Sequence, residues 1–332
     1  MKKSVVINGF GRIGRVLFRI LFERDEFEIF GVNDIYDLDE VVYLLKYDSV
    51  YGPFGKEVEK IDDGRFRVGD KEILYFRSLD LSFLKDISID LLIECSGVYK
   101  HASYFEPFLE KSVKKVIFSF VPSDDTKVII LGVNEKEYED EKIVSNSSCT
   151  SNCLAPVLKL VNEFSPISRV FATTIHSYTA EQNLLDSKIA SFDIRRSRAS
   201  GINIIPFTSG IAFATERVLP FLKNRIRGYS LRVPVCDVTM IDTVLEFENF
   251  VDFALLKEYL RFLPADSSKY VFSSSTPVVS SDIISSAYSS IVDLSFISGV
   301  GGNFVKLLLW QDNEWGYASR VADLSSFIFS LE

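Results

Sequence analysis

The feature that most constrains this chain is a glycine-rich turn, G-x-G-x-x-G, at residues 9–14. The apolar run Ser4–Asn8 precedes the turn, and apolar side chains at helical spacing follow it. Glycines allow the tight turn and the close approach of a pyrophosphate, and the helix N-terminus attracts its charge. Asp34 ends the next strand 20 residues beyond the last glycine, where a carboxylate accepts ribose hydroxyls. An ordinary turn of an α/β protein is the alternative, but the matched order of elements predicts a dinucleotide site.

Apolar runs divide the chain into two differently organised parts. Before residue 148, short runs alternate with helical or loop stretches: Ser4–Asn8, Phe27–Asn33, Ile89–Cys95, Lys115–Ser119, Val128–Leu131 and Ile143–Ser145. After residue 165, longer runs follow with few helices between them: Arg169–His176, Ile226–Val233, Val238–Glu248, Ile291–Ile297 and Phe304–Trp310, before a helical tail over Glu314–Leu331. The first pattern is typical of a parallel sheet covered on both faces, and the second indicates a mostly antiparallel sheet. We therefore predict an α/β chain with a Rossmann-type dinucleotide-binding domain, residues 1–148 plus 314–332, and a second, catalytic α+β domain, residues 149–313.

Composition argues against several classes of protein. The net charge is −9, whereas a general nucleic-acid binder needs an excess of Lys and Arg. No apolar run approaches the length of a membrane span, and the N-terminal apolar strand is too short for a signal peptide. The four cysteines, at positions 95, 149, 153 and 236, form neither a disulfide framework nor a zinc-site spacing. We expect a soluble cytoplasmic protein with reduced thiols that binds no metal, nucleic acid or membrane.

A cysteine begins the helix that follows the last strand of the first part. Residues 145–153, SNSSCTSNC, offer several N-cap side chains and lead into an apolar helical face that extends to about Phe164. Cys149 therefore lies in the first turn, where the helix dipole and free N–H groups stabilise a thiolate and can also hold an oxyanion. A typical cysteine is a small buried hydrophobe instead. The polar neighbours of Cys149 favour a nucleophile, whereas Cys153 lies one turn deeper.

A nucleophilic thiol needs a base, and the chain has two histidines. His101 lies in a polar stretch, and we expect it on the surface. The helix from Cys149 to Phe164 is about 24 Å long at 1.5 Å per residue, and the eight extended residues that end at His176 return about 26 Å. A histidine at a strand end is more often structural. The nearly equal path lengths nevertheless predict that His176 meets Cys149, activates the thiol and relays a proton to and from the substrate oxygen.

At these residues the sequence resembles the phosphorylating glyceraldehyde-3-phosphate dehydrogenase family, and the likeness covers essentially the whole chain. The motifs that carry the resemblance are INGFGRIG at residues 7–14, LKYDS at 45–49, SCT at 148–150, HSYT at 176–179, RVP at 232–234 and WQDNEWGY at 310–317. Several specific motifs in this order make coincidence implausible.

The resemblance implies a role for each matched position. The residues implied to contact the dinucleotide are Gly9, Gly11, Arg12, Ile13, Gly14, Asp34, Arg77, Ser119, Asn313, which holds the nicotinamide amide, and Tyr317, which lies near that ring. Those implied for the substrate phosphate are Thr179 and Arg232, and those for inorganic phosphate are Ser148, Thr150, Arg196, Ser209 and Gly210. Hydroxyl and guanidinium groups suit phosphate because they donate charge-assisted hydrogen bonds. A basic run such as 195–198 is usually solvated, and the sequence leaves open whether Arg195, Arg196 or Arg198 contacts phosphate.

The implied activity is the reversible oxidative phosphorylation of glyceraldehyde-3-phosphate to 1,3-bisphosphoglycerate with NAD(P), in glycolysis or gluconeogenesis. It passes through a thiohemiacetal and a thioester on Cys149. The implied partners are this substrate, inorganic phosphate and further copies of the chain, because the family is typically homotetrameric. One alternative is an erythrose-4-phosphate dehydrogenase, against which the retained segments 178–179 and 208–210 argue. The other is a non-catalytic nucleotide-binding or moonlighting protein, against which the intact Cys149, His176 and Arg232 argue.

Coenzyme preference is where the sequence departs most from the family pattern. NAD-selective members often carry a Leu-Pro or Gly-Pro pair in the stretch that is Asp186–Phe192 here, and this chain lacks it. Ser187 and Lys188 would accept the extra phosphate of NADP, whereas the charge of Asp34 repels it. Ser209 stands where threonine is usual and keeps the hydroxyl group. We expect NAD as the coenzyme, with some tolerance of NADP.

Overall fold

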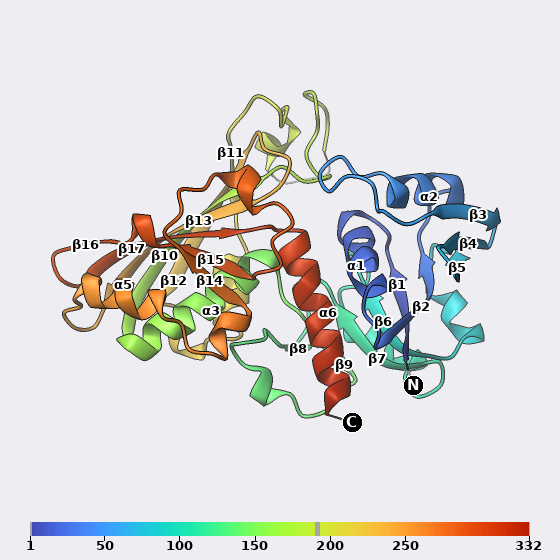
Figure 1. Ribbon diagram of the computed structural model, residues 1–332, viewed down its shortest axis with the longest axis horizontal. Helices are drawn as coiled ribbons and strands as arrows, with labels where there is room; N and C mark the ends of the chain where they lie inside the picture. Colours follow the sequence, from blue (N-terminus) through green and yellow to red (C-terminus); the bar gives the residue numbers. More distant parts are fainter. Residues whose placement is uncertain (1, 190–192, 332) are drawn as a thin grey trace. The chain divides into compact units, whose positions relative to one another are not determined.

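The computed structural model describes residues 2–189 and 193–331 and consists of two units (Figure 1). The first unit comprises Met1–Ile129, Lys136–Ser147 and Ala318–Glu332, and the second comprises Ile130–Glu135 and Ser148–Tyr317. Part of the stretch 186–192, on which the coenzyme prediction rests, lies outside the described residues. No helix in the described ranges is both long and apolar enough to cross a bilayer.

The first unit is built on one sheet whose central strands are parallel. In spatial order its strands are β3 (Val58–Asp62), β4 (Arg65–Val68), β5 (Lys71–Phe76), β2 (Phe27–Asn33), β1 (Lys3–Asn8), β6 (Ile89–Glu94), β7 (Val113–Phe118), β9 (Ile143–Ser145) and β8 (Lys127–Val128). Strands from β5 to β8 pair in parallel, and the strand order reverses between β1 and β6, where open α/β sheets bind ligands. The predicted parallel sheet is confirmed. The antiparallel edge formed by β3, β4 and β5 is a feature that the apolar runs did not predict.

The predicted glycine turn lies between β1 and helix α1 (Arg12–Phe22). Gly9 has a φ of +91°, and a Cβ atom there would lie 2.4 Å from the backbone nitrogen of Ser96. A Cβ atom on Gly14 would lie 2.2 Å from the carbonyl oxygen of Gly9. Both positions therefore require glycine, the first for its conformation and for space and the second for the close approach of helix and strand.

The other helices of the first unit are short, apart from the last one. They are α2 (Leu38–Lys46) and α6 (Trp315–Ser330), which belongs to this unit from Ala318 onward, together with 3-10 turns at Ser82–Asp86, Ala102–Tyr104, Glu106–Phe108 and, across the boundary, Glu135–Glu137. Helix α6 is tied to the unit by the ion pair between Asp323 and Arg24 and by packing of Phe327 against Tyr138. The predicted helical tail is thus present with nearly the predicted bounds.

The second unit is built on a mostly antiparallel sheet, as predicted. In spatial order its strands are β11 (Ile205–Thr208), β12 (Ile226–Val233), β10 (Ile167–Ser177), β13 (Thr239–Phe247), β17 (Phe304–Gln311), β15 (Ser290–Asp293) and β14 (Val271–Ser274), with β16 (Ser298–Val300) paired to β17. The parallel pairs are β10 with β12 and β14 with β15. The predicted strand Ile291–Ile297 is too long, because Asp293 ends it by accepting a hydrogen bond from the backbone of Ser295, and a 3-10 turn follows.

The helices of the second unit are α3 (Cys149–Phe164), α4 (Ile211–Glu216) and α5 (Phe253–Arg261). The 3-10 turns are Ile194–Ser197, Pro220–Leu222, Ser267–Lys269, Ser280–Ile283 and Leu294–Phe296. Helix α3 packs against strands β10, β15 and β17 of the sheet (Figure 1). The bounds of α3 are those of the helix that the sequence predicts. The strand that follows it, β10, returns along the helix, as predicted.

Candidate active site

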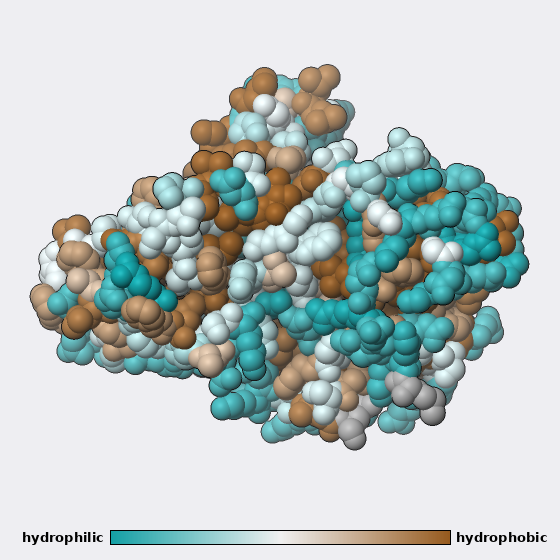
Figure 2. Space-filling model, in the orientation of Figure 1, coloured by the Kyte–Doolittle hydropathy of each residue, from teal (hydrophilic) through white to brown (hydrophobic). Residues whose placement is uncertain are grey.

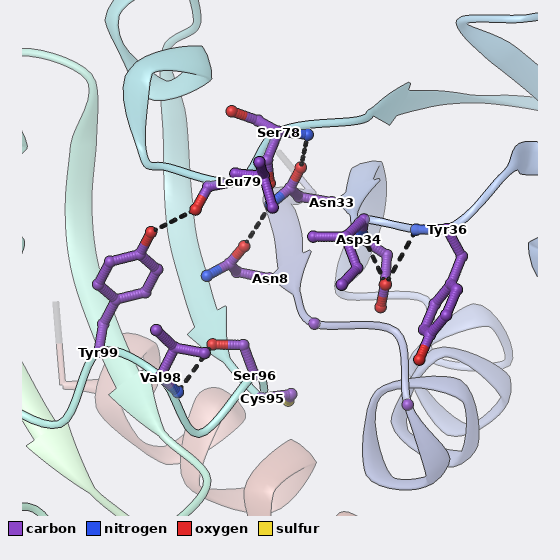
Figure 3. A pocket seen from close by; sticks show the side chains of 13 residues that line it. Asn8, Asn33, Asp34, Tyr36, Ser78, Leu79, Cys95, Ser96, Val98 and Tyr99 are labelled. Carbon is purple, nitrogen blue, oxygen red and sulfur yellow. Dashed lines mark hydrogen bonds between the residues drawn. The ribbon is translucent and has the colours of Figure 1, made fainter.

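A pocket of about 260 Å³ opens in the first unit at the carboxyl ends of β1, β2 and β6 (Figure 3). The residues that line it are Asn8, Gly9, Gly11, Asn33, Asp34, Ile35, Tyr36, Ser78, Leu79, Cys95, Ser96, Val98 and Tyr99. Four of its apolar side chains are largely exposed, namely Ile35, Tyr36, Leu79 and Val98. Exposed apolar walls around a few polar groups suit a flat aromatic base.

Asp34 lies in this pocket, and backbone groups fix its carboxylate. One carboxylate oxygen accepts a hydrogen bond from the backbone N–H of Phe10 at 2.5 Å. The other accepts from the N–H of Ile35 at 2.7 Å (Figure 3). These bonds hold the carboxylate beside the glycine turn, in the place where a ribose would donate its hydroxyl groups to it.

A chain of buried polar side chains supports the pocket, and the sequence analysis missed it. The Asn8 amide donates to the Glu94 carboxylate. The Asn33 amide donates to the Asn8 side-chain oxygen at 2.7 Å, and the Asn33 side-chain oxygen accepts from the N–H of Ser78 at 3.0 Å (Figure 3). Each of the first three residues ends a parallel strand, β1, β6 or β2. Polar residues at successive strand ends were the signal that could have revealed this chain.

Other residues predicted to bind the dinucleotide in this unit do not line the pocket. They are Arg12, Ile13, Gly14, Arg77 and Ser119. The Arg12 guanidinium donates to Asp48 at 2.5 Å. Arg77 is exposed and pairs with Asp37. The Ser119 hydroxyl donates to the backbone oxygen of Glu94 at 3.0 Å. The structure thus gathers Gly9, Gly11 and Asp34 in the pocket but gives these arginines protein partners.

In the second unit the structure brings Cys149 and His176 together. Cys149 is the first residue of α3, and Ser148 caps that helix by accepting a hydrogen bond from the N–H of Ser151 at 3.2 Å. His176 lies near the end of β10 and is 5% exposed. The Sγ atom of Cys149 lies 3.8 Å from Nε2 of His176. His101, the other histidine, is largely exposed and lies near Asp124.

Electrostatics keep the resting pair uncharged. Burial raises the pKa of the Cys149 thiol, and the Arg232 guanidinium and the Thr150 N–H act in the opposite direction. Burial, with a further contribution from Arg232, lowers the pKa of His176 to about 3. Formation of the thiolate therefore depends on the base that the sequence analysis predicted, His176, as well as on the helix terminus. Burial also raises the pKa of Cys95 and that of Cys153 to about 12, which leaves these thiols without comparable activation.

The hydrogen bonds of Nδ1 decide whether His176 can act as a base. Nδ1 lies 2.8 Å from the backbone oxygen of Ser177, and Arg232 also contacts Nδ1. When Nδ1 carries the proton, it donates a hydrogen bond to the Ser177 carbonyl. The lone pair of Nε2 then faces Cys149, as a base requires. The Arg232 contact favours the other tautomer, because a guanidinium can only donate. Removal of Arg232 from Nδ1 therefore favours the basic form of Nε2.

Two guanidinium groups of the second unit are placed to receive an anion. Arg196 and Arg232 lie 4.6 Å and 5.2 Å from the ring centroid of Phe207. The Nε atoms of both are buried without a hydrogen-bond partner among the described residues. Arg196 also pairs with the carboxylate of Glu181, a residue that the sequence analysis did not single out. Buried guanidinium donors without acceptors indicate a site for a further anion.

Arg195 and Arg198, the arginines on either side of Arg196, form ion pairs with acidic side chains at the surface. Arg195 pairs with Asp193 at 2.8 Å, and Arg198 pairs with Asp186 at 2.8 Å. Both side chains are largely exposed. Of the three arginines that the sequence left open, Arg196 thus has the surroundings of an anion-binding residue, which favours the choice of Arg196.

The hydroxyl groups predicted to bind phosphate occupy loop and helix ends. The Ser148 and Thr150 hydroxyls lie 3.1 Å apart at the start of α3. The Thr179 hydroxyl donates to the Gln182 side chain at 3.0 Å. The Ser209 hydroxyl accepts from the N–H of Ile211 at 3.2 Å, next to Gly210 at the start of α4. Each hydroxyl has a protein partner that a phosphate oxygen can replace or join.

Asn313 has a fixed side-chain orientation. Its Oδ1 atom accepts hydrogen bonds from the Ser177 hydroxyl at 3.1 Å and from the Thr239 hydroxyl at 3.0 Å. These two donors fix which end of the amide is the acceptor, so the NH₂ group is the end that can donate to a further group, such as a carboxamide oxygen. Tyr317, predicted to lie near the same ligand, is buried in the first turn of α6.

Comparisons with known proteins show which family the chain resembles along its whole length. A model described as the NAD binding domain of glyceraldehyde 3-phosphate dehydrogenase matches residues 3–102, and one described as its C-terminal domain matches residues 148–313. The chain is 38% identical to glyceraldehyde-3-phosphate dehydrogenase 1 of Bacillus cereus, over 98% of each chain. It is also 38% identical to the Geobacillus stearothermophilus enzyme of that name and to the cytosolic one of Antirrhinum majus, over 99% of each chain.

The Cys149–His176 contact makes a testable prediction about thiol reactivity. Replacing His176 with asparagine removes the proton acceptor, so alkylation of Cys149 by iodoacetamide should slow at neutral pH and require a higher pH. The rate is measured across pH by mass spectrometry of the Cys149 peptide, with inorganic phosphate present as an anion for Arg232. His101→Asn, which changes the exposed histidine, is the matched control and should keep the wild-type profile. If the H176N profile superimposes on that of the control, His176 does not activate the Cys149 thiol.

Proposed function

The chain belongs to the glyceraldehyde-3-phosphate dehydrogenase family of NAD-dependent oxidoreductases, and on this premise we propose that it reversibly converts glyceraldehyde-3-phosphate, inorganic phosphate and NAD to 1,3-bisphosphoglycerate and NADH. The observation that most supports the proposal is the contact of Cys149 with His176, with Arg232 touching the same imidazole. A nucleophile, a base and an anion-binding group in contact are the parts that this chemistry needs. The metabolic setting we propose is glycolysis or gluconeogenesis.

The residues of the first unit fit a dinucleotide. The backbone at Gly9 has no room for a side chain, and the fixed carboxylate of Asp34 faces the pocket. In this proposal Asp34 binds the ribose, and the NH₂ group of Asn313 binds the nicotinamide carboxamide. Bound NAD supplies the acceptor for the hydride of the substrate. We also propose that residues 1–148 plus 314–332 act as the coenzyme domain and residues 149–313 as the catalytic domain.

The proposed chemistry takes place on Cys149. His176 accepts the thiol proton as the sulfur bonds to the aldehyde carbon, and it returns that proton to the substrate oxygen. It then removes the proton of the resulting hydroxyl while the hydride leaves the same carbon, and a thioester remains. An oxygen of inorganic phosphate attacks the thioester carbon, the carbon–sulfur bond breaks, and the acyl phosphate departs. The thiolate recovers a proton for the next cycle.

Arg232 links substrate binding to this base. In the ligand-free chain its guanidinium touches Nδ1 of His176 and donates to the backbone oxygen of Ser177 at 2.9 Å. A substrate phosphate that engages Arg232 competes with both contacts, because a dianion is a stronger acceptor than a carbonyl or an imidazole. Nδ1 then donates to Ser177, and Nε2 is free to accept the thiol proton. The anion thereby prepares the base.

We further propose a homotetramer in the cytoplasm. Support for association comes from the segment between β10 and β11, whose apolar side chains are exposed in the single chain (brown at the top of Figure 2). These side chains are Leu184, Leu185, Ile194, Ile202 and Ile204. Large apolar side chains gathered on one segment are typical of a surface that a partner covers.

A coupled assay tests the proposed activity directly. Purified protein with glyceraldehyde-3-phosphate and NAD should form NADH only when inorganic phosphate is present, as followed by absorbance. Cys149→Ser should bind NAD nearly as the wild type does, because its hydroxyl keeps the shape of the site, but it should form no acyl-enzyme. The Cys153→Ser variant, one turn along α3, is the control and should remain active. A wild type that binds NAD without turnover of this aldehyde would instead be a nucleotide-binding protein or a dehydrogenase of another substrate.

The surroundings of the three arginines predict different effects of their removal. Arg196→Leu should raise the KM for inorganic phosphate by about 10- to 100-fold, since a hydrogen bond to a charged group contributes about 1.5–3 kcal/mol. Arg195→Leu and Arg198→Leu remove only surface ion pairs, and their KM values should stay within about threefold of the wild type. Initial rates at varied phosphate concentration measure all three. Equal effects of the three substitutions would contradict the assignment of Arg196.

The fixed carboxylate of Asp34 predicts how the coenzymes rank. The wild type should use NAD with a much higher kcat/KM than NADP, and some turnover with NADP should be detectable. Asp34→Ala removes the charge that repels a 2′-phosphate, so it should raise the NADP-to-NAD ratio of kcat/KM by at least about tenfold. Asp63→Ala, at a fully exposed acid of the same unit, is the control and should keep the wild-type ratio. Absence of any NADP turnover in the wild type would remove the proposed tolerance.

A further inference from the structure

Two acidic side chains are buried together in the second unit, next to Asn313. Asp237 lies in the corner between β12 and β13, and Asp312 follows β17. They are 2% and 0% exposed. The ladder pairing of Thr239 with Gln311 brings the two residues to the same end of β13 and β17, and their carboxyl groups interact. Two neighbouring carboxylates that are both buried repel each other when both are ionised, so a proton on one of them stabilises the pair.

The surroundings assign that proton to Asp237. One oxygen of Asp312 accepts from the N–H groups of Glu314 at 2.9 Å and Trp315 at 2.6 Å. The other oxygen accepts from the N–H of Ser285 at 2.7 Å. Three backbone donors therefore fix the carboxyl group of Asp312 in place. Burial, and then the charge of Asp312, raises the pKa of Asp237 to about 8, so Asp237 is the neutral acid at physiological pH.

The acid pair joins two segments that hold Asn313. The first is the corner after Asp237, where Val238 has a φ of +76°, a conformation that a β-branched residue rarely adopts. The second is the loop of residues 312–315. Thr239, at the end of the corner, donates to Asn313 at 3.0 Å. The backbone N–H of Ser177, whose hydroxyl also donates to Asn313, donates to the Val238 oxygen at 3.2 Å. The corner and the loop are thus linked both at Asn313 and at the acid pair.

We propose that Asp237, as the protonated partner of Asp312, is a positioning residue that fixes the loop of Asn313 for binding of the nicotinamide carboxamide. This inference rests on the proposed function, because the ligand of Asn313 follows from it. The proton of Asp237 bridges to Asp312, Asp312 orders the backbone of residues 314–315, and Asn313 between them presents its NH₂ group. Asp237 itself does not touch the coenzyme in this arrangement.

Loss of the shared proton turns the attraction between Asp237 and Asp312 into repulsion. Two buried anions in contact repel each other, and the charged groups with the largest influence on Asp237, namely Asp312 and then Glu314, are both acidic. The corner and the loop then separate, and Asn313 loses its fixed orientation. Because the neutral form of Asp237 exists below a pKa of about 8, coenzyme affinity should be constant at lower pH and fall as the pH rises through 8.

The test compares two substitutions of Asp237 with the wild type. The amide of Asp237→Asn donates to Asp312 at every pH, so this variant should keep NAD affinity at pH 7 and lose the alkaline decline. Asp237→Leu cannot donate and leaves Asp312 facing an apolar group, so it should weaken NAD binding at pH 7 by at least about tenfold. Asp266→Asn, at a fully exposed acid of the same unit, is the matched control and should follow the wild type. Dissociation constants are measured by calorimetry with NAD from about pH 6.5 to about 9.5.

A second measurement does not depend on coenzyme binding. At neutral pH the infrared C=O band of protonated carboxylic acids should be weaker in the D237N variant than in the wild type. The band that remains in both includes Glu94, because burial raises the pKa of Glu94 to about 7. The same pH dependence of NAD binding in wild type and D237N, or an unchanged carboxylic acid band, would overturn the inference. A wild type that binds no NAD would count against the proposed function, whereas the infrared comparison would still decide whether the pair shares a proton. Should D237L fail to fold, the D237N profile and the infrared band carry the test.

Discussion

The chemistry of this molecule depends on one contact, between a sulfur at the start of α3 and an imidazole near the end of β10. The distance of 3.8 Å between Sγ of Cys149 and Nε2 of His176 follows from an antiparallel return of the chain. Strand β10 lies inside the sheet, paired with β12 on one side and β13 on the other, so both of its ladders fix the position of His176. The capping box of Ser148 and Ser151 fixes the start of α3 in the same way. The contact is therefore held by backbone hydrogen bonds rather than by the two side chains themselves.

In the ligand-free chain, Cys149 and His176 are neutral, and the cation beside them has no anionic partner at this contact. Burial keeps the thiol protonated and the imidazole neutral, and the nearest cation, Arg232, touches the imidazole instead of an anion. Isolated buried charge is costly, and a neutral pair avoids that cost. In the proposed function, an anionic ligand supplies an acceptor for Arg232 and for the buried Nε of Arg196. Binding and activation can thus be one event, because the same guanidinium serves the ligand or the base.

In each unit, buried polar side chains lie next to a residue that the proposed function assigns to coenzyme binding, Asp34 in the first unit and Asn313 in the second. In the first unit, Glu94, Asn8 and Asn33 form a chain at three neighbouring strand ends. In the second unit, Asp237 and Asp312 join the segments on either side of Asn313. Buried polar networks resist movement, because each member would lose the interactions it has with its neighbours. The network of the first unit places its polar groups at the carboxyl ends of parallel strands, which is where open α/β sheets bind ligands.

The sequence by itself determined the local elements and much of the site. The order of strand, glycine turn and helix predicted β1 and α1, and the polar run before an apolar helical face predicted the position of Cys149, because both patterns are contained within a few consecutive residues. Matched path lengths were sufficient to predict the approach of His176, since a helix and a strand of nearly equal length begin and end together. Composition and local patterns did not predict the antiparallel edge of the first sheet or the shortened strand β15.

Only the tertiary structure decided which distant side chains became partners. Asp237 and Asp312 are 75 positions apart, and their pairing depends on the register between β13 and β17, which local sequence does not specify. The choice of Arg196 among three arginines likewise depends on which side chain packs over Phe207, whereas all three look alike in a basic run. Protonation also belongs to the tertiary level, because burial and neighbouring charge set the pKa values of Cys149, His176 and Asp237. Local sequence patterns determine the helices and strands. The packing of those helices and strands determines which side chains are charged.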